Sequence, residues 1–247
     1  MGRRFGQHFL HRKSILDRIA EAACGEHAPR VVEIGPGKGA LTESLLTRSG
    51  HVTAIEVDPH LVHYLNQKFR DEIDGGRLEV IEGDVLKTDF SGAILAGNLP
   101  YYITSPILEK VFAMGDSWTR AVFLMQSEVA DRLAATPGVR DFGYLSVETQ
   151  VYSEPEILFR VPKEAFRPPP KVESAVVRLE RRSHPGIQDP VSFLAFVSMC
   201  FRHKRKNLRN NLAPLHDAGE AGRLRAEQLS IPQLAALYAK IKLNEAI

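Results

Sequence analysis

The stretch "RVVEIGPGKGALTESLLTRSG", residues 30–50, places a strand, a glycine-rich turn and a helix in direct succession. Its first part is a short β-branched run that ends at glycine, which predicts a buried strand. "ALTESLLTR" then has a helical period, and Gly50 ends it. Between the two, Gly35, Gly37 and Gly39 are spaced GxGxG rather than GxGxxG. Missing β-carbons let a ligand approach the backbone, although a tight turn without a ligand is the alternative.

The same alternation of strand and helix continues on both sides of this stretch. Upstream, "SILDRIAEAA" has helical spacing, and Ser14 with Asp17 predicts a capping box at its start. Downstream follow a strand "HVTAIEVD", a helix "PHLVHYLNQKF", and strands "RLEVIEGD" and "AILAGNLP". Such alternation predicts an α/β fold, a doubly wound parallel sheet with helices on both faces. Ligands of such sheets bind at the carboxyl ends of the strands.

The second half of the chain is less regular. We predict strands at "RAVFLMQ" and "SAVVRLERR", and "SVETQVYSEPEILFRV" leads through a strand to the proline cluster "RPPPKV". After a loop near residues 184–190 the pattern is helical. We therefore predict two domains, an α/β domain over residues 1–183 and a small helical C-terminal domain over residues 184–247.

The composition is that of an ordinary globular protein. Of the 247 residues 44% are hydrophobic and 25% charged, and 32 basic against 30 acidic residues are too balanced to indicate a nucleic-acid partner by themselves. Cys24 and Cys200 form no CxxC pair, which favours a reducing cytosol and no metal site. No apolar run reaches membrane-spanning length. We expect a soluble cytoplasmic protein.

Two acidic residues follow neighbouring strands at the edge where Gly35 lies. Glu56 ends its strand 21 residues beyond Gly35, where a carboxylate can accept both hydroxyls of a ribose. Asp84, in "EGDV", supplies an acceptor suited to an adenine amino group. Each alone is more often a solvated loop acid. Three strand ends together indicate an adenosine-containing ligand.

The fourth strand ends in "NLPY", residues 98–101. The exocyclic amine of adenine is a poor nucleophile because its lone pair is delocalised into the ring. If the Asn98 side-chain oxygen and the Leu99 carbonyl accept its two N–H bonds, the lone pair can point toward an electrophile. Pro100 would fix the turn and Tyr101 would stack on the ring. The alternative makes Asn98 a turn former and Tyr101 a core residue.

Together, "EIGPGKG", "AIEVD", "EGDV" and "GNLPYYITSPIL" resemble the motifs of S-adenosylmethionine-dependent methyltransferases. "GQHFL", "FLMQSEVADRL" and "VPKEAFRPPPKVESAVVRL" extend the resemblance over residues 3–212 to the adenine N6,N6-dimethyltransferases of small-subunit ribosomal RNA. The resemblance implies a Rossmann-like methyltransferase fold and S-adenosylmethionine as methyl donor. It further implies dimethylation of two adjacent adenosines near the 3′ end of 16S rRNA during 30S subunit assembly, by a monomer.

The resemblance also assigns site residues. It places the following near the donor: His8, Leu10, Gly35, Gly37, Glu56, Asp84 and Asn98. It places Asn98, Leu99, Pro100 and Tyr101 around the target amine, with Phe166 on the other face of the base. The family often has Asn where this chain has His8. Taken alone, His8 would be a solvated terminal residue and Phe166 a core residue.

The basic residues of the C-terminal part are concentrated in "RHKRKNLRN", residues 202–210. Such a cluster suits phosphate contacts, which give affinity and salt dependence but little sequence choice. A solvated helix face is the usual alternative. The family commonly has "QRRKTLRN" near this place. The expected RNA-binding residues are Arg202, Lys204, Arg205, Lys206 and Arg209.

Three other functions compete with this prediction. The large-subunit rRNA methyltransferases of antibiotic resistance share the donor site but typically carry Ile in place of Leu99. A non-catalytic RNA-binding assembly factor is a second alternative, against which the intact set of Glu56, Asp84 and Asn98 argues. A NAD-linked dehydrogenase is a distant third.

Overall fold

The computed structural model describes residues 8–182, 186–213 and 216–245. Its contacts divide the chain into two compact units. The first contains Met1–Ala130 and Glu156–Arg181, and the second contains Asp131–Pro155 and Arg182–Ile247. The predicted boundary at residue 183 lies beside the last of these transitions. The prediction did not include the earlier segment, which groups with the C-terminal residues because its apolar side chains share their core.

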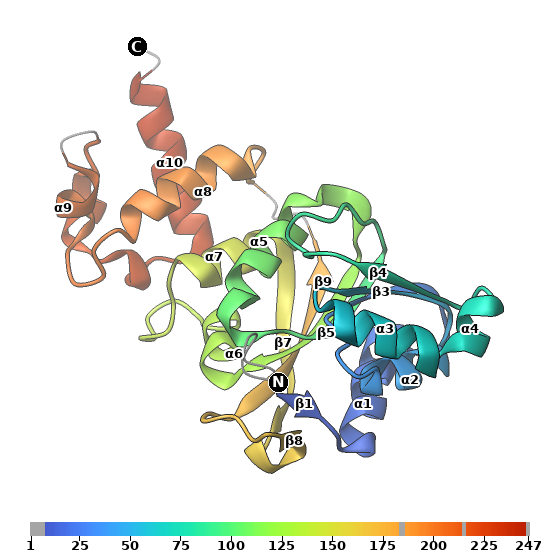
Figure 1. Cartoon of the computed structure of the whole chain (residues 1–247). Helices are drawn as coiled ribbons and strands as arrows, with labels where there is room; N and C mark the ends of the chain where they lie inside the picture. Colours follow the sequence, from blue (N-terminus) through green and yellow to red (C-terminus); the bar gives the residue numbers. More distant parts are fainter. Residues whose placement is uncertain (1–7, 183–185, 214–215, 246–247) are drawn as a thin grey trace. The chain divides into compact units, whose positions relative to one another are not determined.

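The central sheet has seven strands in the order β4-β3-β2-β5-β6-β9-β7 (Figure 1). The first five are parallel, as predicted, whereas β9 runs antiparallel to β6. The sheet is therefore mixed. β7 and β9 are neighbours in the sheet, and the chain forms no α-helix between them. The strands are β2 (Ala28–Ile34), β3 (Ser49–Glu56), β4 (Leu78–Glu82), β5 (Ile94–Asn98), β6 (Arg120–Gln126), β7 (Ser153–Val161) and β9 (Ser174–Arg181).

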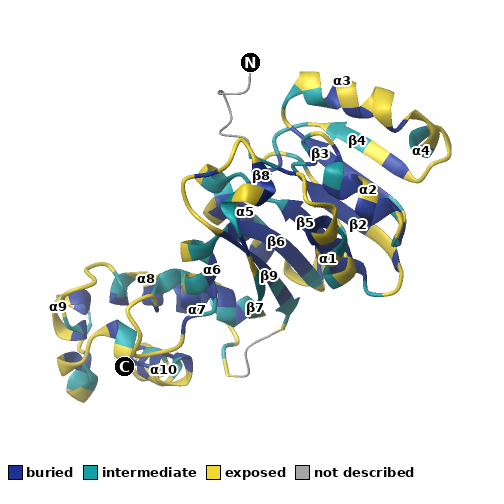
Figure 2. Cartoon of the chain, turned by 90° about the horizontal axis from the view of Figure 1, so that it is seen from below, coloured by how far each residue is buried: buried dark blue, intermediate teal, exposed yellow. Residues whose placement is uncertain are grey.

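Both faces of the sheet are covered. Val122 and Leu124 of β6 join a core cluster with helices α1 (Lys13–Cys24) and α2 (Ala40–Leu46). Phe123 alternates to the opposite face and is also fully buried. Figure 2 shows the inner strands in the colour of buried residues. The other helices are α3 (Pro59–Lys68), α4 (Arg70–Asp74), α5 (Thr104–Ala113), α6 (Ser127–Leu133), α7 (Tyr144–Tyr152), α8 (Pro190–Cys200), α9 (Leu208–Leu212) and α10 (Ile231–Glu245).

Helix α1 does not begin with the predicted capping box. It starts at Lys13, and its N-cap residue Arg12 makes no side-chain cap, so Ser14 already lies inside the helix. Asp17 instead accepts hydrogen bonds from Lys13 Nζ, at 2.5 Å, and from Ser44 Oγ, at 2.8 Å. The acid thus joins α1 to α2 rather than capping α1.

The segment "SVETQVY" is helical, where the sequence predicted a strand. Gly143 N–H donates to Ser146 Oγ at 3.0 Å and starts helix α7. Val147 and Val151 are buried, and their spacing of four residues puts them on one helix face. The β-branched residues had favoured a strand. The prediction is correct for the following stretch, which forms β7.

A short N-terminal strand lies beside a segment more than 150 residues away. Strand β1 (Phe9–Leu10) pairs antiparallel with β8 (Phe166–Arg167). Leu10 lies opposite Phe166, and His11 N–H donates to the Ala165 carbonyl at 3.0 Å. Figure 1 shows β1 next to β8. This pairing carries the end of "GQHFL" to the edge where the parallel strands end.

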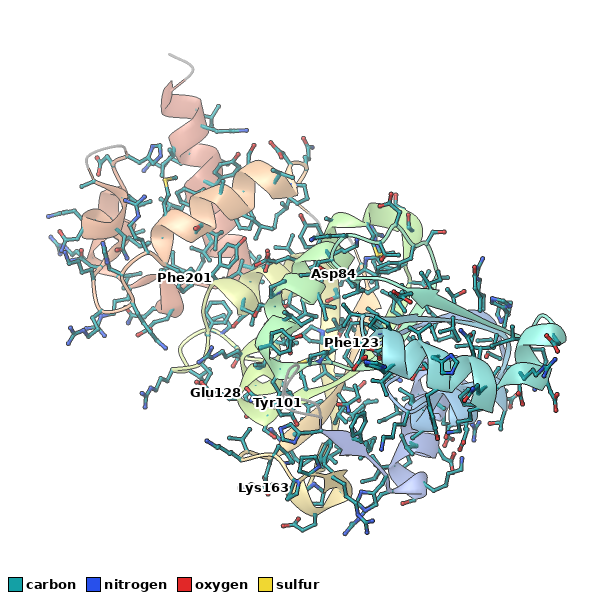
Figure 3. All side chains as sticks on the ribbon, in the orientation of Figure 1. Asp84, Tyr101, Phe123, Glu128, Lys163 and Phe201 are labelled. Atoms are coloured by element: carbon teal, nitrogen blue, oxygen red, sulfur yellow. The ribbon has the colours of Figure 1, made fainter. Side chains whose placement is uncertain are left out.

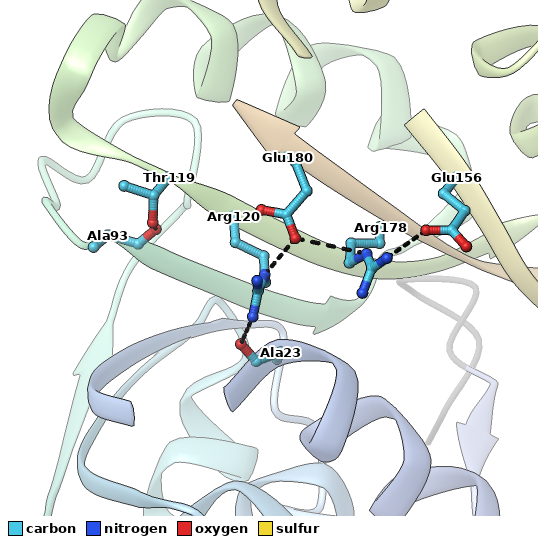
Figure 4. A network of polar contacts seen from close by, with 7 residues as sticks. All are labelled: Ala23, Ala93, Thr119, Arg120, Glu156, Arg178 and Glu180. Atoms are coloured by element: carbon cyan, nitrogen blue, oxygen red, sulfur yellow. Dashed lines mark hydrogen bonds and ion pairs between the residues drawn. The ribbon is translucent and has the colours of Figure 1, made fainter. Parts of the chain in front are cut away.

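The opposite edge of the sheet is closed by ion pairs (Figure 4). Arg120, at the start of β6, donates to Glu180 at 2.6 Å, and Glu180 and Glu156 both pair with Arg178. Arg120 also reaches the Ala23 carbonyl at the end of α1, at 3.5 Å. Two arginines and two glutamates are therefore paired at this edge.

None of the helices within the described ranges combines the length and apolar character required to cross a bilayer. Among the same residues, no group of three or more His, Cys, Asp or Glu side chains is placed to hold a metal ion.

Candidate active site

The polar residues predicted at four strand ends lie along one cleft. Glu56 and Asn98 end β3 and β5, while Gly35 and Asp84 follow β2 and β4. The cleft consists of a cavity of about 360 Å³ and a second of about 240 Å³. Gly35 and Pro100 line both cavities, so the two lie next to each other. Two adjacent cavities can hold two parts of one ligand, such as a nucleoside and the group attached to it.

The glycine-rich turn has the backbone that the sequence predicted. Gly35 and Gly37 have φ of +68° and +58°, a region that other residues rarely adopt. A β-carbon at Gly37 would also come within 3.0 Å of the Phe9 ring. Gly35 lies close to the end of β5, because a β-carbon there would stand 3.9 Å from the Asn98 carbonyl oxygen. The backbone conformation therefore favours glycine at both positions, and at Gly37 the Phe9 ring does so as well.

Glu56 is held by the backbone around it. Its side chain is buried, with 4% of its surface exposed. Oε2 accepts from Gly37 N–H at 3.0 Å, and Oε1 accepts from the N–H groups of Val57, at 3.0 Å, and Asp58, at 3.1 Å. Burial raises the pKa of Glu56, and these three bonds act in the opposite direction. The remaining lone pair on Oε2 can accept one ribose hydroxyl, so the predicted contact with both would have to share the Gly37 bond.

Asp84 lines the smaller cavity, whose other walls include Val57, Val85 and Ile107. One carboxylate oxygen, Oδ1, accepts from Leu86 N–H at 3.0 Å, which fixes the side chain in its turn. Apolar walls with one fixed carboxylate suit a flat ring that carries an amino group. Asp84 is labelled in Figure 3.

The N-terminal segment forms a wall of the larger cavity, through His8 and Leu10 among others. The His8 carbonyl accepts from Asn98 Nδ2 at 3.0 Å, and His8 Nδ1 lies 2.8 Å from the Pro168 carbonyl. The His8 ring stacks on Tyr101 with centroids 5.7 Å apart and planes inclined by 27°. The segment thus lines the larger cavity and also contacts residues 98–101, which we call the target loop.

The target loop is anchored on both sides. Leu99 is buried, and its N–H donates to the Leu124 carbonyl at 2.9 Å. The Pro100 carbonyl accepts from Thr104 Oγ1 at 3.2 Å. The Tyr101 hydroxyl lies 2.6 Å from Ser174 Oγ, and burial raises the pKa of Tyr101, which keeps the phenol neutral. Tyr101 is labelled in Figure 3.

The Asn98 amide has a defined orientation in this loop. Nδ2 donates to the His8 carbonyl, and among the described residues Oδ1 of that amide accepts no hydrogen bond. Among the described residues, none donates a hydrogen bond to the Leu99 carbonyl oxygen. Two acceptors of consecutive residues, both of which line the larger cavity, therefore have no donor among the described residues, as the adenine hypothesis requires.

Phe166 is not brought together with these residues. Its ring is in the core cluster with 2% of its surface exposed, and it does not line either cavity. A contact with the target base requires the ring to leave this position, so the role assigned to Phe166 stays a prediction.

Two residues that line the cleft, and a third that contacts one of its loops, were not assigned from the sequence. Tyr102 lines the smaller cavity and is 60% exposed. Glu33 is buried beside the larger cavity, where Thr42 Oγ1 donates to it at 2.6 Å. Burial raises the pKa of Glu33 to about 8, an effect that Thr42 reduces and the Glu56 charge increases. Glu33 could have been found from the sequence, because an acidic residue inside the apolar run "VVEI" is unusual in a buried strand. The third residue, Lys110, contacts the loop that carries Asp84.

The predicted RNA-binding residues lie in the second unit, in what we call the basic loop, residues 202–209. All five cations of this loop are exposed. Within the described parts of the chain, no carboxylate lies within 4 Å of any of them. Lys204 Nζ donates to the Arg140 carbonyl at 2.8 Å. Their charges are therefore available to a partner in solution.

The basic loop is nevertheless held in shape. Asn211 is buried, and its Nδ2 donates to the carbonyls of Cys200, at 2.7 Å, and His203, at 3.2 Å. Phe201 packs edge-on against the buried Phe142 ring, with centroids 6.2 Å apart. Phe201 is labelled in Figure 3. These contacts hold the backbone of the basic loop, while its cationic side chains stay exposed.

Comparison with solved structures shows the same fold in proteins of known activity. A dimethyladenosine transferase from Plasmodium falciparum matches with a TM-score of 0.84 at 24% identity, over 96% of this chain and 98% of its own. The 23S rRNA methyltransferase ErmE matches with a TM-score of 0.74 at 28% identity, over 95% and 99%.

Sequence comparison identifies curated relatives over nearly the whole chain. The ribosomal RNA small subunit methyltransferase A of Acidobacterium capsulatum is 41% identical, over 97% of this chain and 90% of the relative. That of Synechococcus elongatus is 39% identical, over 95% and 93%. The family model described as ribosomal RNA adenine dimethylase matches residues 1–242. The chain belongs to the ribosomal RNA adenine dimethylase family.

Proposed function

We propose that this chain transfers two methyl groups from S-adenosylmethionine to N6 of each of two adjacent adenosines near the 3′ end of small-subunit ribosomal RNA. The observation that carries the proposal is the orientation of the Asn98 amide. Its N–H is engaged by His8, which leaves Oδ1 and the Leu99 carbonyl as paired acceptors beside Tyr101. A pair of acceptors next to an aromatic ring fits an adenine amine.

The cleft would bind the donor along its length. Asp84 and the apolar walls of the smaller cavity would take the adenine, and the free lone pair of Glu56 would accept a ribose hydroxyl. The larger cavity, which includes Gly35 and Gly37, would hold the methionine end. When bound, S-adenosylmethionine supplies an electrophilic methyl on its sulfonium.

The residues of the target loop would act by positioning. Asn98 Oδ1 and the Leu99 carbonyl accept the two N–H bonds of the amine, so its lone pair turns out of the ring plane toward the methyl group. Tyr101 replaces the stacking that the base loses when it leaves the RNA, a contact worth about 1–3 kcal/mol. No strong base is required, because the methylated nitrogen readily loses its proton to water. Orientation is therefore the main source of rate.

The basic loop would bind the phosphates of 16S rRNA in the assembling 30S subunit. Its cations are exposed and have no acidic partner among the described residues. Such contacts provide affinity without sequence choice. Target choice then belongs to the cleft and to the shape of the RNA, and we place this activity in the cytoplasm, where ribosomal subunits assemble.

A second candidate is methylation of large-subunit rRNA. It is favoured by the likeness to ErmE, whose identity to this chain is 28%. The Leu99 side chain argues against it, because the large-subunit enzymes typically carry Ile at this place.

The choice is tested with purified 30S and 50S subunits from cells that lack the corresponding methylations. Each is incubated with labelled S-adenosylmethionine, and the digested RNA is analysed by mass spectrometry. We expect N6,N6-dimethyladenosine in the small subunit alone. Modification confined to the large subunit would replace our proposal with the second candidate.

A further inference from the structure

The loop that carries Asp84 is irregular but fixed by a lysine from another element. Between β4 and β5, residues 83–93 form neither a helix nor a strand. Lys110, on helix α5, donates from Nζ to the carbonyls of Leu86, at 3.2 Å, and Thr88, at 2.7 Å. Its ammonium also lies 5.2 Å from the centroid of the Phe90 ring. One side chain thus contacts three residues of this loop.

Two short chains of hydrogen bonds connect Lys110 with Asp84. In the first, Leu86 accepts from Lys110 at its carbonyl and donates its N–H to Asp84 Oδ1 at 3.0 Å. In the second, Thr88 accepts from Lys110 at its carbonyl and donates its N–H to the Asp84 carbonyl at 2.8 Å. The first chain fixes the carboxylate and the second fixes the backbone of the same residue. A change at Lys110 therefore reaches both parts of Asp84.

Helix α5 also supports the target loop. Thr104, its first residue, donates to the Pro100 carbonyl, and Ile107, one turn before Lys110, lines the smaller cavity. The helix therefore holds the loop of Asn98 at its start and the loop of Asp84 near its end. Lys110 therefore fixes the position of Asp84, which would bind the adenine of the methyl donor. It fixes this position relative to Asn98 and Leu99, which would bind the target amine.

We propose that Lys110 is a positioning residue for the adenine end of the methyl donor, so that preference for an adenine over a ring without the amino group depends on it. The identity of the ligand rests on the proposed function. The chemical reason is that Asp84 Oδ2 meets a donor in adenine but an acceptor oxygen in hypoxanthine. That distinction is sharp only if Asp84 is held in place.

The test measures dissociation constants for S-adenosylhomocysteine and S-inosylhomocysteine by calorimetry. The variants are Lys110→Met, Lys110→Arg and, as a matched control, Lys87→Met, which removes an exposed charge from the same loop. We expect the wild type and Lys87→Met to prefer the adenosyl compound by on the order of 10-fold or more. Lys110→Met should reduce the preference to about threefold or less, chiefly by weakening the adenosyl compound. Lys110→Arg should restore most of it, because a guanidinium can donate to both carbonyls.

An unchanged preference in Lys110→Met, or equal weakening of both compounds, would overturn the proposal, since a purely structural lysine affects both alike. Loss of preference in Lys87→Met would overturn it too, because charge alone would then be the cause. If Lys110→Met does not fold, Lys110→Gln replaces it and must show a reduced preference. These outcomes concern donor binding alone, so a wild type that binds the adenosyl compound but methylates no rRNA contradicts the proposed function and not the role of Lys110.

Discussion

The strand-end cleft of the first unit and the basic loop of the second use polar residues in opposite ways. In the cleft the functional groups are already bonded: Glu56 accepts three backbone N–H groups, and Asn98 donates to the His8 carbonyl. In the basic loop the side chains of Arg202, Arg205 and their neighbours are exposed, with no carboxylate near them among the described residues. The polar groups of the cleft are oriented by hydrogen bonds, whereas the cations of the basic loop are exposed to solvent.

The difference between oriented groups and exposed cations indicates that the two regions have different roles. Groups fixed before the ligand arrives need no rearrangement during the reaction, which is the condition for orienting a weak nucleophile. Exposed cations bind phosphates of any nucleotide sequence, and this binding weakens as the salt concentration rises. We infer that the cleft determines the chemistry and the basic loop determines RNA affinity. The paired arginines of Figure 4 are a third use of charge, in which ion pairs join neighbouring strands.

The largest expected effect is that of Asn98→Ala. Loss of one oriented acceptor should reduce the rate of methyl transfer at saturating substrates by about 100- to 1000-fold, since the lone pair of the amine is no longer directed. RNA affinity should stay within about twofold, because the loop is intact. The measurement is single-turnover transfer of labelled methyl. A variant that transfers methyl as fast as the wild type would show that Asn98 does not take part in the reaction.

The next effect is that of Glu56→Ala on donor binding. Loss of the ribose acceptor should weaken S-adenosylhomocysteine binding by about 10- to 100-fold. Glu82→Ala is the matched control, because Glu82 lies opposite Glu56 on β4 and is exposed. Calorimetry with the donor and filter binding with RNA separate the two affinities. Equal losses for donor and RNA would contradict the ribose role.

Replacing Lys204, Arg205 and Lys206 with Gln tests the contribution of the basic loop to RNA affinity. We expect RNA binding to weaken about 10-fold at moderate salt and the slope of log K against log salt to fall by about 2. The fall is smaller than 3 because the Lys204 ammonium already bonds to the Arg140 carbonyl.

The matched control for the basic loop neutralises Arg30, Arg70 and Arg77, each of which is paired with an acid in the first unit. Their charge is already compensated, so the salt slope should stay as in the wild type. An equal fall in both variants would mean that net charge, and not the basic loop, controls RNA affinity.

The last effect concerns stability rather than function, and it depends on Glu33. Its pKa is about 8 in the folded protein against an ordinary 4.5, so between these values the folded state binds more protons than the unfolded chain. The stabilising effect of the protonated acid is complete below pH 4.5 and lost by about pH 8. Relative to Glu33→Gln, the wild type should lose about 1 kcal/mol of unfolding free energy per pH unit in this window. Urea titrations at pH 5, 6 and 7 measure it, and a constant difference would refute the raised pKa.

The strand ends were predictable because parallel strands place their carboxyl ends at one edge. Short apolar runs followed by Gly35, Glu56, Asp84 and Asn98 therefore located the cleft without a structure. The basic loop was visible as charge alone.

The remaining features depend on contacts distant in sequence. The pairing of Leu10 with Phe166 and the bond from Asn98 to His8 join segments that no local pattern relates. Lys110 resembled any surface lysine of a helix until its carbonyl partners were known. Helix α7 was missed because its β-branched residues favour strands in isolation, while tertiary burial of Val147 and Val151 favours the helix.

The central claim is that the cleft performs the chemistry and the basic loop supplies affinity. One experiment compares Asn98→Ala with the triple loop variant in single-turnover methylation of unmethylated small subunits, over a range of subunit concentrations. The account predicts that Asn98→Ala stays slow at every concentration, whereas the loop variant reaches the wild-type rate once the subunits are saturating. A loop variant that stays slow at saturation, or an Asn98→Ala rate that recovers there, would contradict it.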